Sequence, residues 1–309
     1  MVLSTAVSGT QSPDSLHESV LMEEASAYLI TDRDGSYVDA TYGRGGHAQA
    51  ILRSLSMQSG LLVMDKDADA IAHARDHVGQ DKRVSVVHDS FVNLTAHLNQ
   101  AVTGVLFDLG VSSPQFDQAE RGFSFNKDGP LDMRMDQSRG ITALAWLKAS
   151  SEQEIADTLW QYGEERHSRK IAGRIKQALS ENRLTTTIHL AELVVGCIGR
   201  RPGRKHPATR TFQALRIRVN NELTDLESVL ADVVQVLVPG GRMVVISFHS
   251  LEDRIVKYFI KGQKHLKLLA KVKPGRAECF SNRRARSALM RVAEVVQSDS
   301  GCMVKMKDR

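Results

Sequence analysis

The chain has few cysteines and few aromatic residues, and it contains no long hydrophobic run. Its cysteines, Cys197, Cys279 and Cys302, are odd in number and widely spaced. That spacing argues against a disulfide scaffold or a zinc site and fits a reducing compartment. No apolar segment is long enough to span a bilayer, and the N-terminus lacks the basic and hydrophobic regions of a signal peptide. We therefore expect a cytoplasmic protein that does not enter membranes.

Acidic residues are absent from one stretch of the chain and nearly absent from another. None occurs between Leu193 and Asn221, a stretch that contains seven Lys and Arg residues. From Arg254 to Arg291, twelve basic residues stand against a single acid, Glu278. Such stretches favour a surface that binds phosphates, and the alternative left open is a pair of solvated faces without a partner. Only 5% of the residues are aromatic, so any base stacking must depend on a few rings.

The first half of the chain alternates between short hydrophobic segments and helical segments. Strands separated by helices imply a parallel sheet with right-handed crossovers. Strands are predicted at 37–40, 61–64, 84–87, 105–107 and 243–246, with further candidates at 290–296 and 302–306, and helices are predicted at 47–55 and 68–78.

The middle of the chain shows only helical periodicity. After Pro207, apolar residues recur every three or four positions from Phe212 to Leu237, which predicts one long helix that stops before Pro239. The simplest architecture is an α/β class with a doubly wound, mostly parallel, Rossmann-like core that is interrupted by a helical insertion. The expected division is a disordered tail at 1–15, a core at 16–125 and 215–309, and an insertion at 126–214.

A glycine-rich turn and an acid follow the first two predicted strands. Gly45 and Gly46 lie where the first strand meets the first helix, a place where backbone N–H groups approach a ligand. The spacing is not that of the NAD fingerprint, and a merely structural turn is the alternative. Asp65 ends the second strand and is suited to bind the ribose hydroxyls of an adenosine-type cofactor. The nearby Asp67 or Asp69 is expected to cap the following helix.

Two further positions follow the third and fourth predicted strands. Phe91 is a ring placed to pack against an adenine, although core packing is an equal alternative. Asp108 opens the segment 108–115 (DLGVSSPQ), where a carboxylate or a loop carbonyl can hold the N–H groups of an exocyclic amine. A plain strand-end cap and turn is the alternative there.

These segments resemble the bacterial 16S ribosomal RNA cytidine-N4 methyltransferase family. The matching segments span nearly the whole chain: 17–24 (HESVLMEE), 39–47 (DATYGRGGH), 108–115 (DLGVSSPQ), 121–125 (RGFSF), 128–135 (DGPLDMRM), 162–166 (YGEER), 206–215 (HPATRTFQAL), 219–223 (VNNEL) and 246–256 (ISFHSLEDRIV). One departure is Arg283, which stands where the family usually has a proline.

The resemblance implies a class I methyltransferase that uses S-adenosylmethionine and acts on one cytidine in the decoding region of 16S rRNA, within the small ribosomal subunit. It implies that the insertion helps to recognise the substrate. The residues that it assigns to the cofactor are Gly45, Gly46, His47, Asp65, Phe91, Asp108 and Gln115, and Asp108 is also the candidate catalytic residue. His249 is expected to contact the target base.

Several alternatives remain open at the level of the sequence. An N4- or N6-specific DNA methylase shares the pocket chemistry, but 112–115 (SSPQ) lacks the aromatic residue that ends the usual motif of those enzymes. A non-catalytic RNA-binding assembly factor is a second alternative, and a homodimer is an open possibility. No metal is expected, because a sulfonium supplies its own leaving group and His73, His77 and His97 do not group with cysteines or carboxylates.

Overall fold

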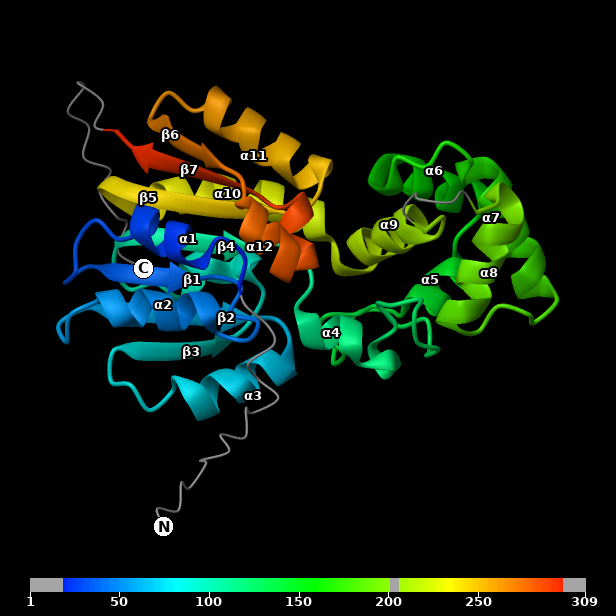
Figure 1. Cartoon of the computed structure of the whole chain (residues 1–309), viewed down its shortest axis with the longest axis horizontal. Helices are drawn as coiled ribbons and strands as arrows, with labels where there is room; N and C mark the ends of the chain where they lie inside the picture. Colours follow the sequence, from blue (N-terminus) through cyan, green and yellow to red (C-terminus); the bar gives the residue numbers. More distant parts are fainter. Residues whose placement is uncertain (1–18, 201–205, 297–309) are drawn as a thin grey trace, which may run out of the picture.

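The computed structural model of the chain describes residues 19–200 and 206–296, and within them seven strands form one sheet in the order β3-β2-β1-β4-β5-β7-β6 (Figure 1). β1 to β5 run parallel, whereas β7 is antiparallel to both of its neighbours. The strands are β1 (Ser36–Asp39), β2 (Gly60–Asp65), β3 (Val84–His88), β4 (Val102–Asp108), β5 (Leu237–Ser247), β6 (Leu266–Val272) and β7 (Leu289–Val295). The expected mostly parallel sheet is confirmed.

Helices cover both faces of this sheet because alternate strand residues point to opposite sides. Tyr37 and Leu106 belong to a buried cluster with α1 (Met22–Leu29), α2 (Gly46–Ser54) and α3 (Ala68–His77). Val38 and Phe107, their neighbours along the strands, belong to a second cluster. That cluster packs against α10 (Glu222–Val236), α11 (Ser250–Gly262) and the 3-10 helix η2 (Phe91–His97).

A group of helices lies beside the edge of the sheet where the parallel strands end (Figure 1). It has its own buried cluster, which includes Leu159, Ile171, Ile175 and Leu215. Its helices are α5 (Ala143–Ala149), α6 (Glu152–Gly163), α7 (Ser168–Ser180), α8 (Thr187–Ile198) and α9 (Thr209–Asn220). Among the residues that the structure describes, no helix has the length and hydrophobicity needed to cross a membrane.

The long helix expected from Phe212 to Leu237 is wrong, because the chain forms two helices, α9 and α10, that meet at Asn221. Asn221 is left-handed, with φ 53° and ψ 29°, a conformation that asparagine tolerates better than most residues. The preceding residue, Asn220, accepts a hydrogen bond from the Met135 amide at 2.7 Å. Its side-chain amide also donates to the Met133 carbonyl at 2.7 Å. These bonds fix the end of α9 to a distant loop and outweigh the continuous helical periodicity.

The strand predictions need two adjustments, and one prediction is not tested. β5 begins at Leu237, so that Pro239 lies inside the strand and not in a loop before it. β6 was not expected, because its charged residues Lys267 and Lys271 obscure the alternation of apolar and polar residues. Such charges suit its position at the edge of the sheet. The candidate strand at 302–306 lies outside the described residues.

Candidate functional site

Acidic residues end three neighbouring parallel strands. β1, β2 and β4 end at Asp39, Asp65 and Asp108, and β1 lies between the other two in the sheet. The carboxyl ends of parallel strands meet at one edge, which is where doubly wound sheets bind ligands. A cavity opens at this edge, and both Asp65 and Asp108 line it. Asp39 is fully buried, and the carboxylates of Asp108 and Asp65 add to burial in raising its pKa to about 7.

The glycine-rich turn is shaped by contacts of its backbone. The Gly43 amide donates to Oδ2 of Asp65 at 2.8 Å, which connects the turn to the end of β2. Gly45 is left-handed, with φ 76°, and a Cβ on it would collide with the ring of Tyr42. Neither Gly45 nor Gly46 lines the cavity, whereas Gly43 does. The two glycines therefore allow the turn to form and place the first turn of α2 beside the cavity.

Asp65 and Phe91 lie on one side of the cavity. Oδ1 of Asp65 accepts from the Asp67 amide at 2.9 Å, and burial raises the pKa of Asp65. Asp67 accepts from the Asp69 amide at the start of α3, so the expected helix cap is confirmed. The ring of Phe91 meets Phe107 edge to face, with centroids 5.6 Å apart. Phe91 therefore packs on the core and also lines the cavity.

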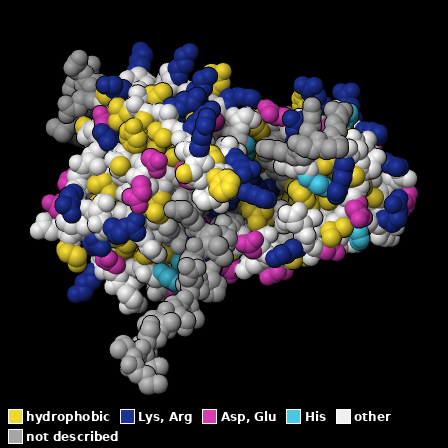
Figure 2. All heavy atoms as spheres, in the orientation of Figure 1, with side chains coloured by type: hydrophobic (Ala, Val, Ile, Leu, Met, Phe, Trp, Pro, Cys, Tyr) yellow, Lys and Arg dark blue, Asp and Glu magenta, His cyan; other side chains and the backbone are white. Residues whose placement is uncertain are grey.

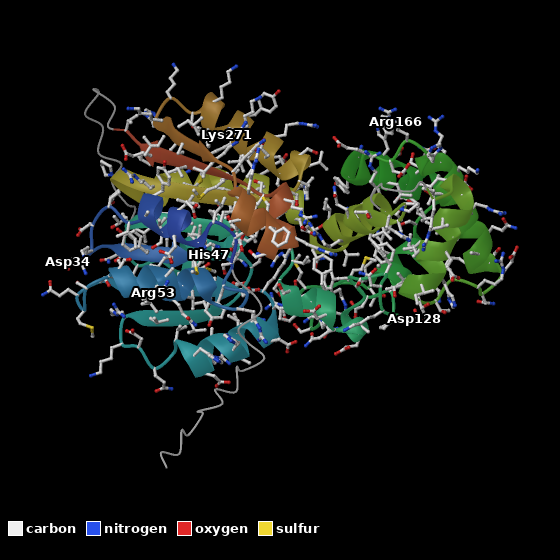
Figure 3. The ribbon with its side chains drawn as sticks, viewed as in Figure 1. Asp34, His47, Arg53, Asp128, Arg166 and Lys271 are labelled. Atoms are coloured by element: carbon white, nitrogen blue, oxygen red, sulfur yellow. The ribbon has the colours of Figure 1, made fainter. Side chains whose placement is uncertain are left out.

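His47 and Asp108 place two unsatisfied polar atoms in the cavity. Oδ1 of Asp108 and Nε2 of His47 are buried and have no hydrogen-bond partner among the described residues. Nε2 of His47 lies 3.7 Å from Oδ2 of Asp108, too far for a hydrogen bond. Burial lowers the pKa of His47 to about 4, with the charge of Arg284 adding to the effect, so the imidazole is neutral at pH 7. The two residues therefore form no ion pair. Figure 3 shows His47 in the sheet part of the molecule.

The backbone of Asp108 is fixed by a hydrogen bond, and its carboxyl group is largely buried. Its amide donates to Oγ1 of Thr41 at 2.6 Å, which ties β4 to the turn after β1. Burial raises the pKa of the Asp108 carboxyl to about 7, although the positive charge of Arg284 opposes the shift. Its side chain is 18% exposed. The carboxyl therefore faces the cavity and changes charge near neutral pH.

The loop after Asp108 is fixed by Gln115 and a buried ion pair. Gln115 accepts from the Ser112 amide at 2.9 Å and donates to Oδ2 of Asp67 at 2.6 Å. Arg121, only 3% exposed, pairs with Asp67 at 2.9 Å. Gln115 lines the cavity, but both ends of its amide already bind protein atoms. The structure thus gives Gln115 a role in orienting the loop.

Arg284 closes the cavity from the C-terminal part of the chain. It donates to the Val111 carbonyl at 2.8 Å and to Oγ of Ser113 at 3.3 Å. Its guanidinium lies 5.2 Å from the centre of the Phe248 ring, within reach of a cation–π contact. Arg284 lines the cavity, whereas Phe248 lines a larger cleft of about 1150 Å³. The contact between Arg284 and Phe248 therefore lies between the cavity and the larger cleft.

His249 lies in the wall of the larger cleft, and not in the cavity of Asp108. It is the N-cap of α11, and its Nε2 lies 3.1 Å from Oε1 of Glu252. Glu222, His249 and Glu252 bring three ligand-type atoms within 4.8 Å of one another. However, Arg216 binds Glu222 through two hydrogen bonds of 2.8 and 2.7 Å, so one of the carboxylates is already neutralised.

The sequence analysis missed three residues of this site. Asp39 had the same signal as Asp65 and Asp108, an acid at the end of a parallel strand. Arg121 and Arg284 had no local signal, because their partners lie 54 and 173 residues away along the chain.

The donor set of the cavity fits S-adenosylmethionine. A sulfonium is a cation, and the strand-end carboxylates make the cavity favourable for one. The unpartnered Oδ1 of Asp108 and Nε2 of His47 need hydrogen-bond partners that residues 19–200 and 206–296 do not supply. Asp65 and Phe91 line the same space, which gives an acceptor for hydroxyls beside an aromatic face.

The sheet order, with an antiparallel β7 between two parallel strands, and the cavity at the carboxyl edge define a class I, S-adenosylmethionine-dependent methyltransferase. Comparison with known sequences gives the particular family. The chain belongs to the MraW methylase family, whose sequence pattern matches residues 14–296.

Two relatives are named ribosomal RNA small subunit methyltransferase H. The protein of Herminiimonas arsenicoxydans is 48% identical over 304 residues, which cover 90% of this chain and 94% of that protein. That of Acinetobacter baumannii strain SDF is 46% identical over 301 residues, which cover 90% of this chain and 97% of that protein. Among solved structures, a putative rRNA methylase of Clostridium thermocellum matches with a TM-score of 0.47 and 13% identity, covering 90% of this chain and 98% of that chain.

Proposed function

We propose that this protein methylates N4 of one cytidine in the decoding region of 16S rRNA, in the cytoplasm, with the small ribosomal subunit as its substrate. Membership of the MraW methylase family and the names of the two relatives support this proposal. The observation that carries it is the cavity in which Asp108 presents an unpartnered carboxylate oxygen beside a second, larger cleft.

The cofactor would be held by residues at the strand ends. Asp65 would accept hydrogen bonds from the ribose hydroxyls, and Phe91 would pack against the adenine. His47 would bind through its unpartnered Nε2. Gly45 and Gly46 would act by shaping the turn. When bound, S-adenosylmethionine supplies an electrophilic methyl group on a sulfonium.

Gln115 would place the loop in which the methyl group meets its acceptor. Its amide is bound at both ends, to the Ser112 amide and to Asp67. A contact between Gln115 and the cofactor is therefore expected to use the aliphatic part of its side chain, or a second lone pair of its oxygen.

Asp108 would prepare the acceptor amine. The lone pair of the cytosine amine is delocalised into the ring, which makes the amine a poor nucleophile. The free Oδ1 of Asp108 would accept an N–H of this amine and favour its pyramidal, reactive form. Most of the gain would come from positioning and from a preorganised charge in a water-poor site. The target base must leave its stack to reach this position.

The helices of the predicted insertion, 126–214, would help to guide the base inward. Glu165, Arg166 and His167 come from this segment and line the larger cleft, opposite Ser247 and Phe248 of the sheet part. Figure 3 shows Arg166 and Asp128 on the helical part of the molecule. This two-walled cleft is suited to an unpaired RNA segment.

The test is methyl transfer to small subunits from cells that lack this protein, with labelled S-adenosylmethionine. Mass spectrometry of the RNA nucleosides should find N4-methylcytidine, and duplex DNA should remain unlabelled. Asp108→Asn should lower turnover about tenfold or more, because an amide holds the N–H groups less well. Asp76→Asn, an exposed acid on α3, is the matched control and should behave as wild type. Label in DNA alone, or in no nucleic acid while S-adenosylmethionine fails to bind in calorimetry, would refute the proposal.

A further inference from the structure

An exposed phenylalanine projects from the short helix α12 (Arg276–Ser281). The side chain of Phe280 is 87% exposed, although phenylalanine is usually among the buried residues. Among the described residues, Phe280 is more exposed than the other large hydrophobic side chains at the surface, such as Met57, Tyr258 and Trp160. Its neighbour Cys279 lines the larger cleft, so Phe280 lies at the rim of that cleft.

Basic residues flank Phe280 along the chain, and two of them, Lys273 and Arg286, line the same cleft as Cys279. Here we call the group of Lys273, Arg276, Phe280, Arg283 and Arg286 the cationic platform. All four basic residues are exposed. Lys273, Arg276 and Arg283 form no ion pair within 19–200 and 206–296. Arg286 donates through Nε to the Cys279 carbonyl at 3.0 Å, which fixes its stem beside Phe280. Figure 2 shows Lys and Arg side chains gathered around the hollow between the two parts of the molecule.

The acid of this segment does not neutralise the platform. Glu278 accepts a hydrogen bond from the Leu21 amide at 2.7 Å and is partly buried. The carboxylate is thus used to fasten α12 to the N-terminal part of the fold. The exposed face of the segment keeps its positive charge.

Acids in the adjoining cleft are also paired. Asp253 binds Arg291 at 2.7 Å, and Glu164 binds Arg254 at 3.2 Å. Glu165 is only 3% exposed and accepts from a backbone amide. The cleft therefore continues the positive surface of the platform toward the pair of Phe248 and Arg284.

We propose that the cationic platform binds single-stranded RNA, with a base stacked on Phe280 and phosphates on the surrounding arginines and lysine. The bound nucleotides would flank the one that enters the cleft, so this inference rests on the proposed function. Exposed aromatic rings among cations are the usual means of holding unpaired nucleic acid, because every base offers a stacking face. The platform would raise affinity for RNA and take no part in methyl transfer itself.

Binding is measured with a fluorescein-labelled single-stranded RNA of about twelve nucleotides, by anisotropy on the full chain. Phe280→Ala should weaken binding about fivefold or more, because a stacked base is lost. Phe280→Trp should keep the affinity, and RNA should quench the fluorescence of the new indole. In the double variant Arg276→Gln, Arg283→Gln, the affinity for RNA should depend less steeply on salt concentration, by the amount expected for the loss of about two phosphate contacts. Met57→Ala, with a side chain 74% exposed elsewhere, is the matched control and should change nothing.

Kinetics separate this inference from the proposed function. Phe280→Ala should raise the KM for small subunits and leave the Kd for S-adenosylmethionine unchanged. If wild type methylates subunits and Phe280→Ala has the same KM and RNA affinity, the platform is refuted while the proposed function stands. A change in self-association without a change in RNA binding also refutes it, since Phe280 would then belong to a protein interface. If wild type methylates no RNA, the proposed function fails, whatever the anisotropy shows.

Discussion

The pH profile of methyl transfer should show a fall in activity on its acid side, near neutral pH, because of Asp108. We call this part of the profile the acid limb. Its carboxyl has a pKa raised to about 7 by burial, and its Oδ1 has no partner in the cavity. Only the carboxylate can accept a hydrogen bond from the acceptor amine through both oxygens, because the protonated acid carries an O–H on one of them. Activity should therefore rise with pH as Asp108 ionises.

The size of the effect follows from the pKa. With a pKa of about 7, roughly a tenth of the carboxyl is ionised at pH 6 and roughly nine-tenths at pH 8. The value of kcat/KM should therefore increase about tenfold between these two pH values. Because kcat/KM for S-adenosylmethionine reports the enzyme without this ligand, the limb in that quantity reflects the cavity before the cofactor binds.

Arg284 supplies an internal check on the cause of this limb. Its positive charge lowers the pKa of Asp108, so Arg284→Gln should move the limb to higher pH. Asp108→Asn should remove the limb and leave a low, flat profile. Arg286→Gln is the control. Arg286 does not line the cavity, so this variant should not change the charge there or the pH at which the acid limb occurs.

The assay is initial-rate methylation of small subunits across pH 5.5 to 9, with subunit integrity checked at each pH. A flat wild-type profile would refute the role given to the Asp108 carboxylate. So would a limb that persists in Asp108→Asn, and the buried Asp39, whose pKa is also about 7, would then be the group that titrates.

Three further outcomes are expected. Because the pKa of Asp39 rises from 3.8 to about 7 on folding, this group should take about 2–3 kcal/mol of stability from the native state between pH 5 and pH 8, in addition to any share from Asp65 and Asp108; Asp39→Asn should make the loss smaller by about that amount in denaturant titrations, and an unchanged slope would contradict it. Arg121→Met leaves Asp67 buried without its partner and should cost about 3–5 kcal/mol, read from the same titrations, with Arg121→Lys losing less. Gly45→Ala would strain a left-handed turn against Tyr42 and should weaken S-adenosylmethionine binding in calorimetry, whereas an unchanged Kd would show that the turn adapts.

The sheet could be predicted because its signals are local. The strand segments predicted at 61–64 and 105–107 are each followed directly by an acid, and the alternation of strands and helices fixes a parallel arrangement. All carboxyl ends then share one edge. The amino-acid sequence is therefore enough to place Asp65 and Asp108 in one cavity, and both residues line it.

The break between α9 and α10 could not be predicted, because the periodicity continues through it. It depends on hydrogen bonds from Asn220 to residues 133 and 135, far away in the sequence. The buried pair of Arg121 and Asp67 is similar, since its two residues are 54 positions apart and each looks like a surface charge. Long-range polar contacts of this kind leave no pattern in a single sequence.

The sequence also could not show that the cofactor and the RNA would occupy separate spaces. The structure has two such spaces, the cavity and the cleft, and their charges differ. Four carboxyl groups line the cavity, those of Asp65, Asp108, Glu222 and Glu252, together with the basic Arg44, Lys66 and Arg284, and its carboxylates can face a cation such as a sulfonium. The cleft beside it is bordered by exposed Arg166, Lys273 and Arg286, which favour phosphates. After methyl transfer the cofactor product has lost its positive charge, so the carboxylates no longer attract it by charge. The same electrostatic division that would sort the substrates would therefore also assist release of the used cofactor while RNA is still bound.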